Sequence, residues 1–184
     1  MLVRHGKTLG NKERRFIGSG TDEGLCAEGA TELEVMTKSG IYSAFTPEIV
    51  YSSSMRRCLE SANIIFSKSK IVPVENLHEM HFGDFEGLTH AEIILRPGCA
   101  NFGIDEEHMD FPGGEGYRDF SARCLEAFNG LLSKEQHSFA IVLHGGVIMA
   151  IMQELFGGDM YGYSVMNGKG YLLTLGENKE WLTL

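Results

Sequence analysis

Two histidines, His5 and His144, each follow a short apolar run and are each followed by glycine. The runs are residues 1–3 and 139–143, and each predicts a buried strand that ends where the glycine lets the backbone turn. Ligands of an open α/β sheet bind beyond the carboxyl ends of its strands. We therefore expect both imidazoles in one crevice, where their chemistry would be nucleophilic attack or anion binding.

His5 is a candidate nucleophile for phosphoryl transfer. Neutral imidazole dominates near pH 7, and its free nitrogen can attack phosphorus without a separate base. A backbone carbonyl at this tight turn could fix the tautomer. The alternative is a structural histidine that hydrogen-bonds within the core, and the same alternative applies to His144. If His144 is functional, we expect it to donate a hydrogen bond to the same anion and to be cationic when the anion is bound.

Arginines near these histidines indicate an anionic ligand. Arg4 precedes His5, and a guanidinium buried at a strand end is costly without a partner. Its planar fork suits two phosphate oxygens, although a structural ion pair would also satisfy it. Arg57 falls on the first turn of a predicted helix, whose N-terminus also favours an anion. Arg56 is expected to be a solvated surface charge. Together these residues predict a phosphoryl group as the ligand.

A leaving alkoxide must be protonated, so a carboxylic acid should stand beside the phosphate. Glu79 is the first acid after the predicted third strand, and Asp84 and Glu86 compete with it; the sequence does not choose among them. His78, Glu79 and His81 could instead bind a metal. Their spacing lacks the two-turn helical register of a metalloprotease, so no metal site is expected.

The elements that must position these residues alternate along the chain. We predict strands at 1–4, 47–52, 71–74 and 139–143, helices at 27–39, 53–66, 89–95, 116–134 and 146–156, and a long loop at 7–25. Ser53 or Ser54 is expected to cap the second helix. The tail, residues 163–184, reads as two or three strands. This order predicts a three-layer αβα sandwich with a mostly parallel sheet and an antiparallel edge strand.

Bulk properties bound the function class. With 184 residues, one domain over 1–184 is expected. The net charge of -9 argues against nucleic acid and anionic membranes as partners. No apolar stretch approaches the roughly 20 residues of a membrane span, and no signal-like segment is seen. The four cysteines form no Cys-x-x-Cys pair, which favours reduced thiols and a cytoplasmic location.

Several blocks of this sequence resemble the histidine phosphatase superfamily, also called the phosphoglycerate mutase-like family. The matching blocks occur in the family's order and cover almost the whole chain. They are Leu2-Val3-Arg4-His5-Gly6-Lys7-Thr8 with Asn11 and Arg15, Asp22-Glu23-Gly24-Leu25 with Gly29, Tyr51-Ser52-Ser53 through Arg57, Leu77-His78-Glu79 with Phe82-Gly83 and Glu86-Gly87, Pro112-Gly113-Gly114-Glu115, and His144-Gly145-Gly146.

The resemblance implies a role for each site residue. His5 would become phosphorylated, while Arg4, Arg57 and His144 would hold the phosphoryl oxygens. Glu79 would act first as the general acid and then as the base that activates water. The substrate-binding residues implied are Asn11, Ser53 and Gly145. Neither a metal nor an organic cofactor is implied.

The resemblance also implies a function: a phosphomonoester hydrolase acting on a small phosphorylated metabolite. Small bacterial members of this size include α-ribazole phosphatases of cobalamin assembly, which makes α-ribazole 5′-phosphate the leading specific substrate. A phosphoglycerate mutase-type transfer and a non-catalytic phospholigand-binding protein are the alternatives. Monomer and homodimer both stay open.

An insert at about 88–117 is expected to cover the pocket. It contains Phe102, His108, Met109 and Phe111, and its aromatic content would suit a nucleoside-like leaving group. These residues could equally pack the insert onto the sheet.

Overall fold

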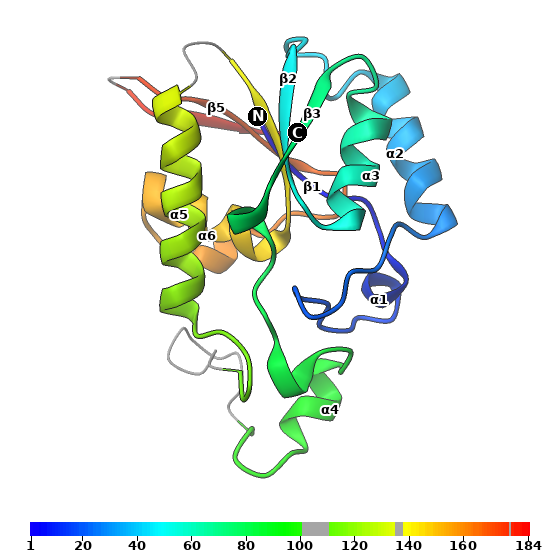
Figure 1. Cartoon of the computed structure of the whole chain (residues 1–184), viewed down its shortest axis with the longest axis vertical. Coiled ribbons are helices and arrows are strands. Elements are labelled where there is room, and N and C mark those ends of the chain that lie inside the picture. Colours follow the sequence, from blue (N-terminus) through cyan, green and yellow to red (C-terminus); the bar gives the residue numbers. More distant parts are fainter. Residues whose placement is uncertain (101–110, 135–137, 177) are drawn as a thin grey trace.

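A six-stranded sheet forms the centre of the molecule in the computed structural model, which describes residues 1–100, 111–134, 138–176 and 178–184 (Figure 1). The strand order is β3-β2-β4-β1-β5-β6. The strands are β1 (Leu2–Arg4), β2 (Ile49–Ser53), β3 (Lys70–Val74), β4 (Ala140–Leu143), β5 (Gly170–Thr174) and β6 (Glu180–Thr183).

The first four strands run parallel, and the tail supplies the antiparallel part. β4 pairs in parallel with both β1 and β2, and β2 pairs in parallel with β3. β5 is antiparallel to β1, and β6 is antiparallel to β5. The predicted mostly parallel sheet with an antiparallel edge is thus confirmed, with two tail strands making that edge.

Side chains of the central strands alternate between two apolar layers, as period-2 strands require. Val3 and Val142 pack with the helices α2 (Ala27–Ser39) and α3 (Arg56–Ile65). Leu2, Ile141 and Leu143 pack with α5 (Tyr117–Lys134) and α6 (Gly145–Phe156). Figure 1 shows these two helix pairs on opposite sides of the sheet. The three-layer αβα sandwich is confirmed.

Two local predictions were wrong. The segment 7–25 is not all loop, because α1 (Leu9–Lys12) forms there behind a capping box made by Thr8 and Asn11. The cap of α3 is Met55 rather than Ser53 or Ser54, and no side chain caps this helix. The Ser54 hydroxyl instead donates to Glu75, and the Ser53 hydroxyl bonds to a histidine described below.

The remaining short elements are η1 (Glu75–Leu77), η2 (Gly83–Phe85), α4 (His90–Ile94) and η4 (Met160–Tyr163). Figure 1 places α4 well away from the sheet. Phe111 is buried and its ring contacts Phe82 and Phe85, so this part of the insert packs onto the core. Phe102, His108 and Met109 lie outside the described residues. In the described ranges, no helix has the length and apolar character to cross a membrane.

Candidate active site

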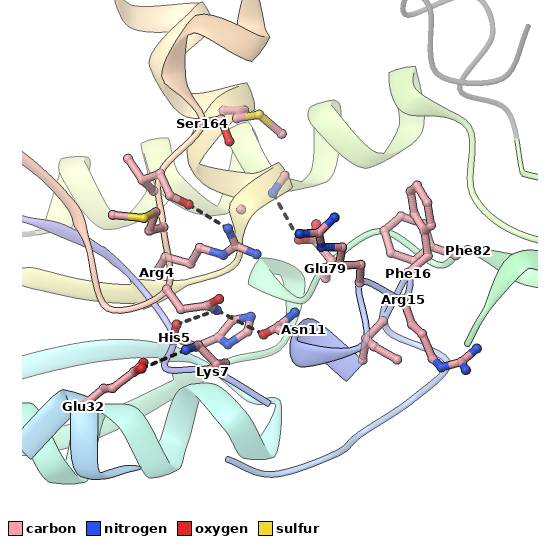
Figure 2. A pocket seen from close by; sticks show the side chains of 18 of the residues that line it. Arg4, His5, Lys7, Asn11, Arg15, Phe16, Glu32, Glu79, Phe82 and Ser164 are labelled. Atoms are coloured by element: carbon pink, nitrogen blue, oxygen red, sulfur yellow. Dashed lines mark hydrogen bonds and ion pairs between the residues drawn. The ribbon is translucent and has the colours of Figure 1, made fainter. Parts of the chain in front are cut away.

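The adjacent parallel strands β1 and β4 bring His5 and His144 together. Arg4 is in register with Leu143, so each histidine is the first residue beyond its strand. The ring centroids lie 5.2 Å apart with an interplanar angle of 63°. A pocket of about 830 Å³ opens beside His5, and its wall includes Arg4, Asn11 and Glu79 (Figure 2). The predicted crevice therefore holds His5, whereas the neighbouring ring of His144 is fully buried and is not part of the described pocket wall.

The His5 tautomer is fixed by a backbone contact. Nδ1 lies 2.7 Å from the Gly6 carbonyl oxygen, and a carbonyl can only accept, so Nδ1 carries the proton. Nε2 is then the nitrogen with a free lone pair. Burial lowers the pKa of His5 well below 6.5, and the charges of Arg57 and Arg4 lower it further. His5 is thus a neutral imidazole with Nε2 able to act as a nucleophile near pH 7.

Arg4 supplies a cation on the pocket wall. One terminal nitrogen, Nη1, donates to the Val165 carbonyl at 2.7 Å. Its Nε is a buried donor that has no hydrogen-bond partner among the described residues. An orphaned donor in a buried site is costly, and a bound oxyanion would satisfy it. This is the clearest structural sign that the pocket takes an anion.

Arg57 lies fully buried behind the pocket wall at 1% exposure. Its guanidinium donates to the backbone carbonyls of Thr21, Ile17 and Gly18, at 3.0, 3.3 and 3.2 Å. Its Nε donates to Nδ1 of His144 at 3.3 Å. These hydrogen bonds hold the Arg57 guanidinium in place beside the ring of His144.

His144 is held by partners on both ring nitrogens. Because Nδ1 accepts from Arg57, Nε2 carries the proton and donates to the Ser53 hydroxyl at 2.8 Å. Burial lowers the pKa of His144 well below 6.5, with Arg57 and His5 adding to the shift. His144, Arg57 and Ser53 are buried and are not among the residues of the pocket wall. Their expected contacts with substrate stay predictions. In this structure the ring of His144 packs against that of His5, and Arg57 and Ser53 hydrogen-bond to His144.

Glu79 reaches the opposite side of the pocket from the segment after η1. Its carboxylate accepts from the backbone N–H of Met80 and of Gly146, both at 3.1 Å. Gly146 belongs to the first turn of α6, where the helix dipole favours a negative charge. A Cβ at Gly146 would lie 2.5 Å from a Glu79 oxygen, so glycine permits this approach. Glu79 is only 8% exposed yet lies on the pocket wall.

The competing acids have different surroundings. Glu86 accepts from the backbone of Gly18, Gly20 and Phe82 and from the Thr21 hydroxyl, so it organises a loop. Neither Glu86 nor Asp84 is part of the pocket wall. Among the three candidate acids, only Glu79 shares the pocket with His5.

Asn11 lies on the pocket wall, where its side chain accepts hydrogen bonds from one backbone amide and one side-chain amide. Its Oδ1 accepts from the backbone N–H of Thr8 at 3.2 Å and from Nδ2 of Asn167 at 3.0 Å. Among the described residues Nδ2 of Asn11 has no hydrogen-bond partner, so this donor can serve a ligand. Asn167 also donates to the carbonyls of His5 and Gly6, at 3.1 and 3.4 Å. Asn167, which no sequence pattern indicated, thus joins the tail to the turn that carries His5.

Gly145 contributes backbone to the pocket wall beside the Arg4 guanidinium, where an added Cβ would come within 3.4 Å of Cζ.

Other cations lie on the same wall. Lys7 is paired with Glu28 and Glu32 at 2.9 and 2.8 Å, which largely neutralises it. Arg15 bonds to Glu13 and extends away from Arg4 and His5, as Figure 2 shows. Arg14 also lies on this described wall, and Arg4 is the one of these cations that is adjacent to His5 in the chain.

Arg123 is a second residue of the site that no sequence pattern indicated. It forms a bidentate pair with Glu115 at 2.6 and 2.7 Å. It also donates to the carbonyls of Asn76, His78 and Glu79, at 3.0, 2.9 and 3.1 Å. This clamp holds the backbone that carries the Glu79 carboxylate. On sequence alone it looks like one more charge on an amphipathic helix.

Replacement of Arg123 by alanine should destabilise the fold by about 2–4 kcal/mol, because three carbonyls and Glu115 lose their shared donor. Urea denaturation followed by circular dichroism measures this change. Arg123→Lys keeps the charge but loses the bidentate geometry, so it should lie between the alanine variant and the parent. A loss below about 0.5 kcal/mol in the alanine variant would contradict the clamp.

The two buried histidines make stability depend on pH. The unfolded chain binds protons as the pH falls below 6.5, whereas folded His5 and His144 stay neutral well below that value. Stability from this source is complete above pH 6.5 and is lost as the pH falls towards the folded pKa values. The loss approaches about 2.7 kcal/mol per pH unit for the pair.

Urea unfolding at pH 7.5 and at pH 5.5 measures this dependence. His5→Asn and His144→Asn each remove one titrating group, so each should roughly halve the pH-dependent loss attributed to the pair. Comparison of slopes, rather than absolute stabilities, separates this effect from any packing defect. An unchanged slope in both variants would show that neither histidine is buried in its neutral form.

Metal ligation by His78, Glu79 and His81 was the alternative for this segment. His78 Nδ1 contacts the Glu79 carbonyl at 3.0 Å, and His81 Nδ1 accepts from Gly83 N–H at 3.1 Å. Within the described part of the chain, no three histidine, cysteine or acidic side chains cluster as a metal site would require.

The αβα sandwich with strand-end histidines beside Arg4 is a phosphoglycerate mutase-like fold. The family model of the histidine phosphatase superfamily (branch 1) matches residues 1–182. The chain belongs to this superfamily, and the resemblance noted in the sequence is confirmed.

Relatives and solved structures agree on the family. Glucosyl-3-phosphoglycerate phosphatase of Mycolicibacterium vanbaalenii is 27% identical over all of this chain and 82% of its own length. 2,3-bisphosphoglycerate-dependent phosphoglycerate mutase 2 of Gloeobacter violaceus is 27% identical over 84% of this chain and 74% of its own. The alpha-ribazole phosphatase from Shigella flexneri superposes with a TM-score of 0.83 at 25% identity, over 96% of this chain and 90% of that one. Both phosphatases and mutases are thus among the relatives.

Proposed function

We propose that this protein is a phosphomonoester hydrolase in which His5 accepts the phosphoryl group of a small phosphorylated metabolite. One observation carries the proposal: the Gly6 carbonyl holds the Nδ1 proton of His5, which leaves Nε2 as a nucleophile on the wall of the pocket. The orphaned Nε of Arg4 on the same wall supports an anionic substrate.

In the first step, Nε2 of His5 attacks phosphorus in line with the leaving oxygen. A nitrogen–phosphorus bond forms and the phosphorus–oxygen ester bond breaks. Protonated Glu79 gives its proton to the departing alkoxide, which is released as the free alcohol. The backbone N–H groups of Met80 and Gly146 stabilise the carboxylate that remains.

In the second step, the Glu79 carboxylate takes a proton from water while the water oxygen attacks phosphorus. The nitrogen–phosphorus bond breaks, its electron pair returns to Nε2 of His5, and inorganic phosphate leaves. Glu79 is protonated again and ready for the next ester. The same carboxyl group thus acts as acid and then as base.

Charge stabilisation in this proposal comes from Arg4, Arg57 and His144 around the phosphoryl oxygens. Asn11 would donate through Nδ2, and Gly145 would line the entry. Ser53 acts through His144, whose Nε2 proton it accepts. Since His5 supplies the nucleophile and the arginines supply the charge, the mechanism needs no metal ion. We expect hydrolysis to persist in the presence of a chelator.

The substrate is proposed as a small phosphorylated metabolite, with α-ribazole 5′-phosphate as the leading specific candidate. The similarity to the Shigella flexneri structure supports this choice. We further propose one domain over residues 1–184 and a cytoplasmic location. Phosphate release measured over a metabolite panel that includes α-ribazole 5′-phosphate tests the function. Absence of phosphate release from every phosphomonoester would contradict it.

A mutase is the second candidate, because relatives include phosphoglycerate mutases. Incubation with 3-phosphoglycerate and 2,3-bisphosphoglycerate separates the two activities. A mutase yields the 2-phospho isomer, whereas the proposed hydrolase releases inorganic phosphate. Formation of the 2-phospho isomer faster than phosphate release would replace the hydrolase with the mutase.

A further inference from the structure

A second cavity of about 310 Å³ opens beside Glu79. Its wall is mostly aromatic and sulfur-containing, and we call it the aryl cavity. Six of its residues define it: Phe82, Tyr117, Phe120, Met149, Met160 and Tyr161. Such walls are typical of subsites that hold flat apolar groups.

The aryl cavity is continuous with the pocket that contains His5. Phe16, Glu79, Phe82, Gly146 and Met149 line both spaces. Figure 2 shows the rings of Phe16 and Phe82 next to Glu79, on the side away from Arg4 and His5. A substrate with its phosphoryl group at Arg4 and His5, and its ester oxygen at Glu79, would therefore extend its alcohol part towards these rings.

Charge in the aryl cavity favours an uncharged alcohol part. Glu79 is the one carboxylate on its described wall, no arginine or lysine is present there, and His90 is the one side chain that can become cationic. A second phosphate or a carboxylate in this cavity would be desolvated near Glu79 without a permanently charged cation beside it, which is costly. The cationic side chains Lys7, Arg14 and Arg15 belong to the larger pocket instead.

The volume of the aryl cavity further restricts which alcohol groups can bind there. A dry cavity of about 150 Å³ holds one benzene ring, so about twice that volume accommodates a fused two-ring system. The Phe16 and Phe82 rings, 5.3 Å apart and nearly perpendicular, offer a face and an edge to such a group. We propose that the aryl cavity is the leaving-group subsite and that the substrates are phosphomonoesters of uncharged, apolar, ring-containing alcohols. This inference rests on the proposed hydrolase function.

The test compares 2-naphthylmethyl phosphate with glycerol 3-phosphate. Both are esters of primary alcohols, so their leaving groups differ little in intrinsic reactivity and mainly in apolar surface. Burial of the naphthyl ring should raise kcat/KM for the first ester on the order of 50-fold over the second. Equal kcat/KM values for the two esters would overturn the subsite.

Met149→Gln places an amide on the wall that the two cavities share. We expect kcat/KM for 2-naphthylmethyl phosphate to fall about 10-fold, and that for glycerol 3-phosphate to fall by a smaller factor, because Met149 also lines the pocket that contains His5. Tyr161→Ser, at a residue that is 41% exposed, gives a second test that does not disturb the core. Val35→Gln is the matched control, because Val35 is 61% exposed on α2 and lies on neither wall.

The outcomes separate the two proposals. Hydrolysis of both esters with no preference, unaffected by Met149→Gln and Tyr161→Ser, would remove the aryl cavity subsite and leave the hydrolase function intact. A fall for both esters alike would show a general defect and would also contradict the subsite. Absence of hydrolysis and of His5 phosphorylation with either ester would end both proposals.

Discussion

Replacement of Glu79 by glutamine is expected to lower kcat/KM for alkyl phosphates by about 10²- to 10⁴-fold. The amide cannot protonate a departing alkoxide. It keeps the size of the side chain, but its single carbonyl oxygen can accept from only one of the Met80 and Gly146 N–H groups. An aryl ester such as p-nitrophenyl phosphate has a leaving group that departs without a proton. The first step with this ester should therefore survive, while attack of water on the phosphoenzyme slows. Stopped-flow measurement should show a burst of nitrophenol close to one equivalent.

Asp84→Asn is the matched control for Glu79→Gln. Asp84 is the neighbouring acid that the sequence could not separate from Glu79, and it lies outside the pocket wall. Its replacement should change kcat/KM less than about threefold. Normal alkyl phosphate hydrolysis by Glu79→Gln, or a large loss in Asp84→Asn, would mean that the acid is misassigned.

Replacement of His5 by asparagine is expected to reduce kcat by at least about 10⁴-fold, the scale seen when a covalent nucleophile is removed. Asparagine is short and uncharged, so the pocket and its cations persist while Nε2 is lost. No burst should occur with p-nitrophenyl phosphate. His81→Asn serves as the control, because His81 is exposed and absent from the pocket wall, and it should keep near-normal activity.

The strand-end histidines could be predicted because their signal is local. A short apolar run followed by a histidine and a glycine indicates where a strand stops, and β1 and β4 stop there. The left-handed residue that ends α2, Gly40 with φ 83°, follows from the same kind of local rule. Local rules also gave the order of helices and strands, and hence the layers.

The α3 cap shows where local rules fail. Ser53 and Ser54 are good capping residues, but the hydroxyl of Ser53 bonds to His144 and that of Ser54 bonds to Glu75. His144 lies 91 residues from Ser53 in the chain, and Glu75 lies 21 residues from Ser54, just after β3. A serine satisfied elsewhere cannot cap, and the sequence does not show which partner wins.

Asn167 and Arg123 escaped prediction for the same reason. Asn167 acts on the His5 turn from a position 162 residues along the chain. Arg123 acts through backbone carbonyls near Glu79, and carbonyls leave no mark in the sequence. The available signals were weak: Asn167 precedes a glycine, and Glu115 follows a glycine pair near the start of α5.

The central claim is that the phosphoryl group passes through Nε2 of His5. The direct test is to mix Glu79→Gln protein with p-nitrophenyl phosphate, digest it, and locate the modification by mass spectrometry under alkaline conditions that preserve phosphohistidine. We predict an acid-labile phosphoryl group on the peptide that contains His5. A phosphoryl group on any other residue, or none while nitrophenol is released in a burst, would contradict the account.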